Sequence, residues 1–191
     1  MSSPDVISIF KEINALLEGH FIYASGRHGN RFLQASRVLQ YPEHVSTLCK
    51  AIADHFKDAG PELVVGPATG GIILAYETAR HIGCRGVFAE KEPDGTMAVK
   101  RGFAVQPGTK VLVVEDIITT GGSVQKTITH LRERGADIIG VGVLIDRSGG
   151  AATFDCPFHA LGEIQLDSWA ADEVPADLAA IPVMEPDDLV L

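Results

Sequence analysis

Short apolar runs separated by helical patterns constrain the fold of this chain more than any other feature. Residues 111–115 form one such run and residues 138–145 a longer one. Residues 70–82 and 123–134 have the apolar spacing of helices, and Gly135 is a stop signal after the second. Strands without polar alternation are typical of a parallel sheet covered by helices on both faces. The pattern predicts an α/β fold with a mostly parallel central sheet. Further strands are expected over 62–66 and 86–90.

Two more helices are expected in the N-terminal part of the chain. Residues 3–5, Ser-Pro-Asp, combine a cap, a first-turn proline and an acid, which predicts a helix start. Apolar residues recur at helical spacing as far as Leu17, so this helix is expected to end at Gly19. A second helix is predicted after Pro42, with Gly60 closing it.

The remaining segments are less regular. Residues 91–108 are rich in Pro, Gly and charged side chains, and predict a long loop or a weak hairpin. Long loops in compact domains are usually functional. The last 40 residues, acidic and proline-containing, are expected to wrap the domain edge or form a small cap. The length of 191 residues suits a single domain over 1–191.

Composition excludes several classes of function. Sixteen Lys and Arg against 25 Asp and Glu give a net charge of -9, so we expect no nucleic-acid partner. We expect no membrane partner, because no run approaches the roughly 20 apolar residues that cross a bilayer. The first ten residues lack the pattern of a signal peptide. Cys49, Cys84 and Cys156 are too scattered for a zinc site or a disulfide framework, which favours the cytoplasm.

Two adjacent carboxylates, Glu115 and Asp116, stand at the outlet of an apolar strand. Ligands of open parallel sheets bind beyond this end of the strands. The simplest reading is that the acids face solvent or cap the next helix. The alternative is that they hold hydroxyl groups or a metal, because buried acids are costly unless solvated or paired. Carboxylates accept hydrogen bonds from vicinal diols and stabilise positive charge on a sugar ring.

A bend rich in hydroxyls and glycines follows the acids. Backbone N–H groups at such a bend and at the next helix start form an anion site. The bend lacks the lysine of a Walker loop. A diol site beside a phosphate site describes a 5-phosphorylated ribose. The bend consists of Thr119, Thr120, Gly121, Gly122 and Ser123.

The segment 111–123, VLVVEDIITTGGS, is similar to the phosphoribosyl-pyrophosphate motif of the type I phosphoribosyltransferases. Three further segments resemble the orotate branch of that family. Residues 19–27, GHFIYASGR, are similar to its substrate segment, and residues 65–72, VGPATGGI, to its pyrophosphate loop. Residues 143–147, VLIDR, resemble a strand end with an arginine for the orotate carboxylate. The resemblance covers roughly residues 15–150.

The resemblance implies a type I phosphoribosyltransferase-like fold with a flexible catalytic loop. Its core would span about 45–150, and residues 1–40 with the C-terminal segment would form a small hood over the substrate. It also implies roles for the acids: Glu115 and Asp116 hold the ribose 2- and 3-hydroxyls, with Asp116 near the developing positive charge. Residues 119–123 would cradle the 5-phosphate, with Thr119 also near the base.

Further roles follow from the same resemblance. Thr69 and Gly70 would bind pyrophosphate through backbone N–H groups, although a plain strand-to-helix turn is the alternative. Arg147 would meet the orotate carboxylate, since a planar fork suits that group. Its alternative is an ion pair with Asp146 or another nearby acid. Phe32 would pack on the base, and an ordinary core phenylalanine is an equally open reading.

Cations are needed on the leaving pyrophosphate. Lys91, Lys100 and Arg101 are the candidates on the loop, and a solvated basic pair is the alternative for the last two. Mg²⁺ is the implied cofactor, bound mainly through the sugar diphosphate. The chain departs from the family pattern at Ala24, where a lysine is common, and at residues 93–96, which lack the usual lysine and histidine.

The resemblance implies transfer of the 5-phosphoribosyl group from phosphoribosyl pyrophosphate to orotate. It also implies a homodimer in which the loop of one subunit reaches the site of its neighbour. A purine phosphoribosyltransferase remains an alternative, although Arg147 would then have no carboxylate to bind. A non-catalytic regulator that senses phosphoribosyl pyrophosphate is the other.

Overall fold

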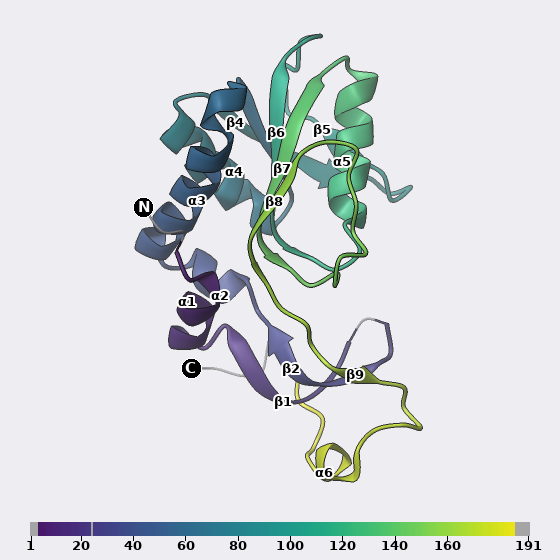
Figure 1. Ribbon diagram of the computed structural model, residues 1–191. Coiled ribbons are helices and arrows are strands. Elements are labelled where there is room, and N and C mark those ends of the chain that lie inside the picture. Colours follow the sequence, from purple (N-terminus) through teal and green to yellow (C-terminus); the bar gives the residue numbers. More distant parts are fainter. Residues whose placement is uncertain (1–3, 24, 186–191) are drawn as a thin grey trace.

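The computed structural model describes residues 4–23 and 25–185 (Figure 1). Ser3 and Ala24, noted above, lie outside the described residues. Within them, a six-stranded sheet has the order β5-β4-β3-β6-β7-β8. All neighbouring strands are parallel except β4 and β5. The predicted mostly parallel sheet is therefore confirmed. Its strands are β3 (Leu63–Pro67), β4 (Arg85–Lys91), β5 (Met97–Val99), β6 (Lys110–Ile118), β7 (Asp137–Asp146) and β8 (Phe158–Glu163).

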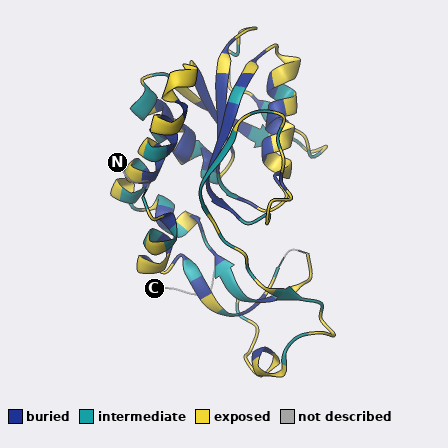
Figure 2. Cartoon of the chain, in the orientation of Figure 1, coloured by how far each residue is buried: buried dark blue, intermediate teal, exposed yellow. Residues whose placement is uncertain are grey.

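Helices cover both faces of this sheet. Leu112 and Val114 of β6 belong to the apolar cluster beneath α3 (Pro42–Phe56) and α4 (Gly70–Ile82). Val111 and Val113 belong to the cluster beneath α5 (Gly122–Glu133). Successive strand residues point to opposite faces, so one apolar run supplies both halves of the core. Figure 2 shows these strands as the buried centre of the molecule. The helices predicted over 70–82 and 123–134 are confirmed.

The N-terminal segment corrects one prediction. Helix α1 (Val6–Glu12) is shorter than expected, because Asn14 has a φ of 52° that a helix cannot continue. Leu17 and Gly19, expected in and just after the helix, both lie within strand β1 (Leu16–Ile22). Residues 13, 15 and 17 are buried, which is the two-residue repeat of a strand. The same apolar residues also fit the repeat of a helix, which explains why the helix was predicted too long. Strand β1 pairs antiparallel with β2 (His28–Leu33).

A second, smaller sheet joins the two ends of the chain. Strand β9 (Ser168–Trp169) pairs with β2, which gives the order β1-β2-β9. Helix α6 (Ala176–Ala179) lies nearby, and the Met184 N–H donates to the His20 carbonyl at 2.7 Å. Figure 1 shows this small sheet set apart from the main sheet. We call β1, β2, β9 and α6 the hood. The last 40 residues thus extend the main sheet through β8 and complete the hood. The short helices α2 (Ser36–Leu39) and η1 (Lys57–Ala59) flank α3.

Residues 91–108 contain a hairpin rather than an irregular loop. Strand β5 folds back on β4, and the Glu92 N–H donates to the Thr96 carbonyl at 2.9 Å. The Lys126 ammonium of α5 donates to the Gly95 carbonyl at 2.6 Å. The hairpin tip is therefore tied to the helix that begins at the predicted phosphate bend. No helix in the described part of the chain is long and apolar enough to cross a membrane.

Candidate active site

The two carboxylates lie inside β6, not beyond its end as the sequence suggested. The strand continues to Ile118, because Ile117 and Ile118 still pair with β7. Glu115 faces the α5 side, and only 9% of its surface is exposed. Burial, and then the neighbouring Asp116 carboxylate, raise the pKa of Glu115 to about 8. Burial also raises the pKa of Asp116. The pair therefore resists carrying two negative charges unless a ligand donates to it.

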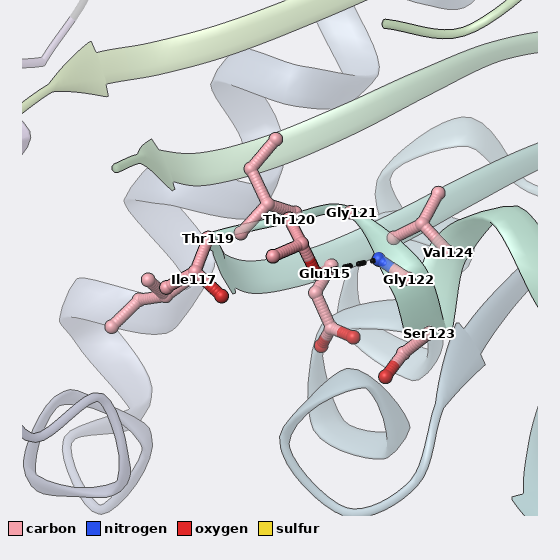
Figure 3. Close-up of a pocket in the computed structure, with 9 residues that line it drawn as sticks. Glu115, Ile117, Thr119, Thr120, Gly121, Gly122, Ser123 and Val124 are labelled. Atoms are coloured by element: carbon pink, nitrogen blue, oxygen red, sulfur yellow. Dashed lines mark hydrogen bonds between the residues drawn. The ribbon is translucent and has the colours of Figure 1, made fainter. Parts of the chain in front are cut away.

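The predicted phosphate bend encloses a cavity of about 90 Å³, room for a few water molecules. Gly121 precedes α5 with a φ of 73°, a conformation that favours glycine. Figure 3 shows the Glu115 carboxylate beside the bend, with the Ser123 hydroxyl nearby. The structure thus brings Glu115 together with every residue of the predicted bend. The cavity is lined by Glu115, Ile117, Ile118, Thr119, Thr120, Gly121, Gly122, Ser123 and Val124.

The Asp116 side chain faces the pyrophosphate loop instead of this cavity. A Cβ atom built on Gly70 would lie 2.1 Å from the Asp116 Oδ2 atom. Gly70 is the first residue of α4, so the carboxylate lies against the N-terminal end of that helix. A Cβ atom on Gly66 would lie 2.0 Å from the Gly71 carbonyl oxygen, and the Ala68–Thr69 peptide bond is cis. Gly66 is closed to a side chain because the contact there is with backbone, whereas at Gly70 the contact is with the end of the Asp116 side chain.

Arg147 directly follows β7, and among the described residues no ion pair with Asp146 or another acid is found for it. The Asp146 carboxylate accepts instead from the Ser148 N–H at 2.6 Å. The buried Arg147 Nε has no hydrogen-bond partner among the described residues. Burial lowers the pKa of Arg147. A half-buried guanidinium with an unused donor fits an anionic ligand better than an internal ion pair.

The aromatic residue expected at the base, Phe32, lies in the hood. Its ring centroid is 5.6 Å from that of Phe21 and 6.4 Å from that of Tyr23. It is half-buried, and its packing on the base stays a prediction beside the reading as an ordinary core phenylalanine. Tyr23 was not among the predicted site residues, yet its ring centroid lies 5.6 Å from the Arg147 Cζ atom. Periodicity within one segment gives no signal for such a contact between the hood and β7.

The candidate cations differ in their surroundings. Lys100 forms an ion pair with Glu92, and Arg101 forms one with Glu90 at 2.7 Å. Both basic side chains are exposed and occupied within the hairpin, so neither reaches the cavity in this structure. Lys91 is exposed at the end of β4. Two residues earlier, β4 pairs with Pro67, which opens the pyrophosphate loop. Lys91 therefore lies at the same edge of the sheet as that loop.

Similarity to known proteins agrees with this geometry. The Phosphoribosyl transferase domain family matches residues 34–177. An orotate phosphoribosyltransferase of Chlorobium phaeobacteroides is 46% identical over 186 residues, covering 97% of this chain and 96% of that protein. The chain belongs to the orotate phosphoribosyltransferase family. Another member of the family, from Caldicellulosiruptor bescii, is 43% identical and covers 97% of both chains. The resemblance inferred from the sequence motifs is confirmed.

Solved structures support the fold of this orotate phosphoribosyltransferase family member. The orotate phosphoribosyltransferase from Aeropyrum pernix aligns with a TM-score of 0.71 and 26% identity, over 83% of this chain and 93% of that one. An adenine phosphoribosyltransferase from Rhodothermus marinus aligns with a TM-score of 0.65 and 22% identity, over 83% and 98%. The second likeness shows that the fold alone does not select the base, so the base must be argued from the site.

Proposed function

We propose that this protein transfers the 5-phosphoribosyl group from phosphoribosyl pyrophosphate to orotate, giving orotidine 5′-phosphate and pyrophosphate. Arg147 carries the proposal. Its half-buried guanidinium has an unused donor, and Arg147 N–H donates to the Ile118 carbonyl at 2.8 Å, directly before the phosphate bend. A base that bears a carboxylate would supply the missing acceptor and pair with the charge.

The sugar site would work through its two carboxylates. Hydroxyl groups that donate to Glu115 would favour its charged form, offsetting the burial that raises its pKa to about 8. Asp116, which lies against Gly70, would then face the leaving group and the sugar carbon that bears it. Positive charge that develops on the ribose ring is stabilised by negative charge placed beforehand. The N–H groups at the start of α5 would hold the 5-phosphate.

The leaving group would be held at the start of α4. Backbone N–H groups around Thr69 and Gly70 favour an anion there, and Lys91 would add positive charge from the neighbouring strand end. We propose Mg²⁺ as the cofactor. The ion would be held mainly by phosphate oxygens of the sugar diphosphate, with Glu115 and Asp116 nearby. When bound, the ion neutralises charge on the pyrophosphate.

We propose a homodimer in which the β4–β5 hairpin serves the site of the partner. One face supports an association surface: Ile73 is 44% exposed and Tyr76 is 70% exposed on α4. They border a groove of about 450 Å³ between α4 and α3. Large apolar side chains gathered at a groove are typical of interaction sites. Opening of the hairpin ion pairs would free Lys100 and Arg101 for a ligand.

Turnover with orotate tests this function. Protein mixed with Mg²⁺, phosphoribosyl pyrophosphate and orotate should consume orotate absorbance, and Asp116→Asn should abolish that loss. Turnover with adenine or guanine but not orotate would favour a purine enzyme, which leaves Arg147 without a carboxylate. Binding of phosphoribosyl pyrophosphate without transfer to any base would favour a regulator.

A further inference from the structure

One contact between the segment that follows β1 and the end of β7 involves an arginine that the base site needs. The Arg147 Cζ atom lies 5.6 Å from the Tyr23 ring centroid, within the range of a cation–π contact. Arg147 comes from β7, whereas Tyr23 follows β1. The contact therefore joins two sheets, each of which supplies part of the predicted base site.

The Tyr23 side chain of this pair is held from behind. The Tyr23 hydroxyl donates to the Arg31 carbonyl at 2.6 Å. The Tyr23 N–H donates to the Arg27 carbonyl at 2.8 Å, and the Gly26 N–H donates to the Tyr23 carbonyl at 2.8 Å. A Cβ atom on Gly29 would lie 2.0 Å from the Tyr23 hydroxyl, so only glycine there leaves room for the ring. The ring is a fixed platform rather than a mobile surface side chain.

Unused polar atoms lie on the arginine side of the contact. Arg147 Nε and Ser148 Oγ are both buried and have no hydrogen-bond partner among the described residues. The Arg147 Cζ atom lies over the Tyr23 ring, and the ring carbons offer no hydrogen-bond acceptor to the guanidinium. The guanidinium donors therefore remain available to a ligand with two acceptor oxygens.

We propose that Tyr23 is a positioning residue that makes the site prefer a base carrying a carboxylate. This inference rests on the proposed function. The ring orients the Arg147 guanidinium and shields it from water, so that the guanidinium donates to both oxygens of the base carboxylate. Without the ring, the Arg147 side chain would be more mobile and more exposed to water. Its ion pair with a carboxylate would then contribute less to binding.

Product binding tests the proposal without requiring turnover. Orotidine 5′-monophosphate and uridine 5′-monophosphate differ only in the carboxylate, so the ratio of their Kd values by calorimetry reports its recognition. The wild type should prefer orotidine 5′-monophosphate. Tyr23→Leu should lower that preference about 10-fold, with uridine 5′-monophosphate affinity unchanged. Tyr23→Phe, which keeps the ring, should stay within about twofold of the wild type.

Two controls separate positioning from folding. Tyr41→Leu removes another half-buried tyrosine, beside His44, and should leave the preference unchanged. In an Arg147→Leu background, Tyr23→Leu should have no further effect on the ratio, because the ring acts through the arginine. Circular dichroism checks folding. Tyr23→Met fills the space with a flexible apolar chain and replaces Tyr23→Leu if that variant does not fold.

The outcomes separate this inference from the function beneath it. An equal loss of affinity for both nucleotides in Tyr23→Leu, or an unchanged preference, overturns the role of Tyr23 and leaves orotate as the base. A wild-type protein that binds both nucleotides equally overturns the carboxylate site itself, and with it both proposals.

Discussion

At the residue scale, Gly70 lies against the Asp116 carboxylate, the side chain proposed to be catalytic. Alanine favours a helix more than glycine does, yet its methyl group would meet the Asp116 carboxylate oxygen at 2.1 Å. The end of a side chain moves at low cost, so Gly70→Ala should displace Asp116 while the urea midpoint of unfolding stays close to wild type. Turnover should fall about 100-fold, as expected for a misplaced catalytic group. Full turnover in this variant would contradict the role of Asp116.

Glu115 makes the stability of the protein depend on pH. Its pKa is raised to about 8 in the folded state, above that of an unfolded glutamate, so the folded state binds more protons between the two values. Stability is then highest near pH 5 and falls as the pH rises towards 8. Glu115→Gln should remove this loss and be more stable than wild type at pH 8, on the order of 2 kcal/mol. Urea unfolding at pH 5 and pH 8 measures it, and identical pH dependence in both proteins would contradict the burial argument.

At the element scale, the β4–β5 hairpin and the residues beside it carry Lys91, Lys100 and Arg101. The last two form ion pairs with Glu92 and Glu90. No ion pair is found for Lys91 within the described residues, and it lies beside the pyrophosphate loop. If its partner is leaving-group charge, Lys91→Ala should lower kcat about 100-fold while the KM for phosphoribosyl pyrophosphate changes little. Lys50→Ala, which removes an exposed pair with Asp54 on α3, is the control. Weaker binding with kcat preserved would place Lys91 outside the reaction.

The elements that the sequence predicted well are those whose pattern is complete within one segment. The core strands and α4 follow from apolar runs and glycine stops, and the bend after β6 follows from its hydroxyls. The C-terminal end of β6 could not be predicted, because Ile117 and Ile118 belong to the strand only through their pairing with β7. For β1, the apolar spacing around Leu17 fits a helix and a strand equally, and only the pairing with β2 decides for a strand.

At the scale of the whole molecule, the proposed loop exchange can be tested by mixing subunits. Asp116→Asn damages the sugar site, and Lys100→Ala combined with Arg101→Ala damages the hairpin residues proposed to reach the partner. If the hairpin serves the partner, a mixed dimer contains one site with both defects and one intact site. Random reassociation should then recover about a quarter of wild-type activity from two inactive proteins. If each hairpin serves its own subunit, every site keeps one defect and no activity returns.

The contact between Tyr23 and Arg147 lay beyond sequence reasoning for a related cause. Arg147 was predicted because it directly follows an apolar strand. In the structure it contacts Tyr23, whose ring centroid lies 6.4 Å from that of Phe32. Tyr23 reaches it only because the hood packs beside β7, and that packing joins residues more than 100 positions apart. Motifs locate groups that bind a ligand, whereas groups that position them depend on the assembled fold.

The hood has a consequence for how the protein is made. Its middle strand β2 emerges from the ribosome early, but its partner β9 follows only after the whole main sheet. A nascent chain that stops at Ile145 already contains the phosphate bend and both carboxylates, yet it lacks Arg147, Trp169 and the segment that bonds to His20. We expect such a fragment to retain a sugar-phosphate site without the ability to select a base. Base selection is therefore acquired last, when translation is nearly complete.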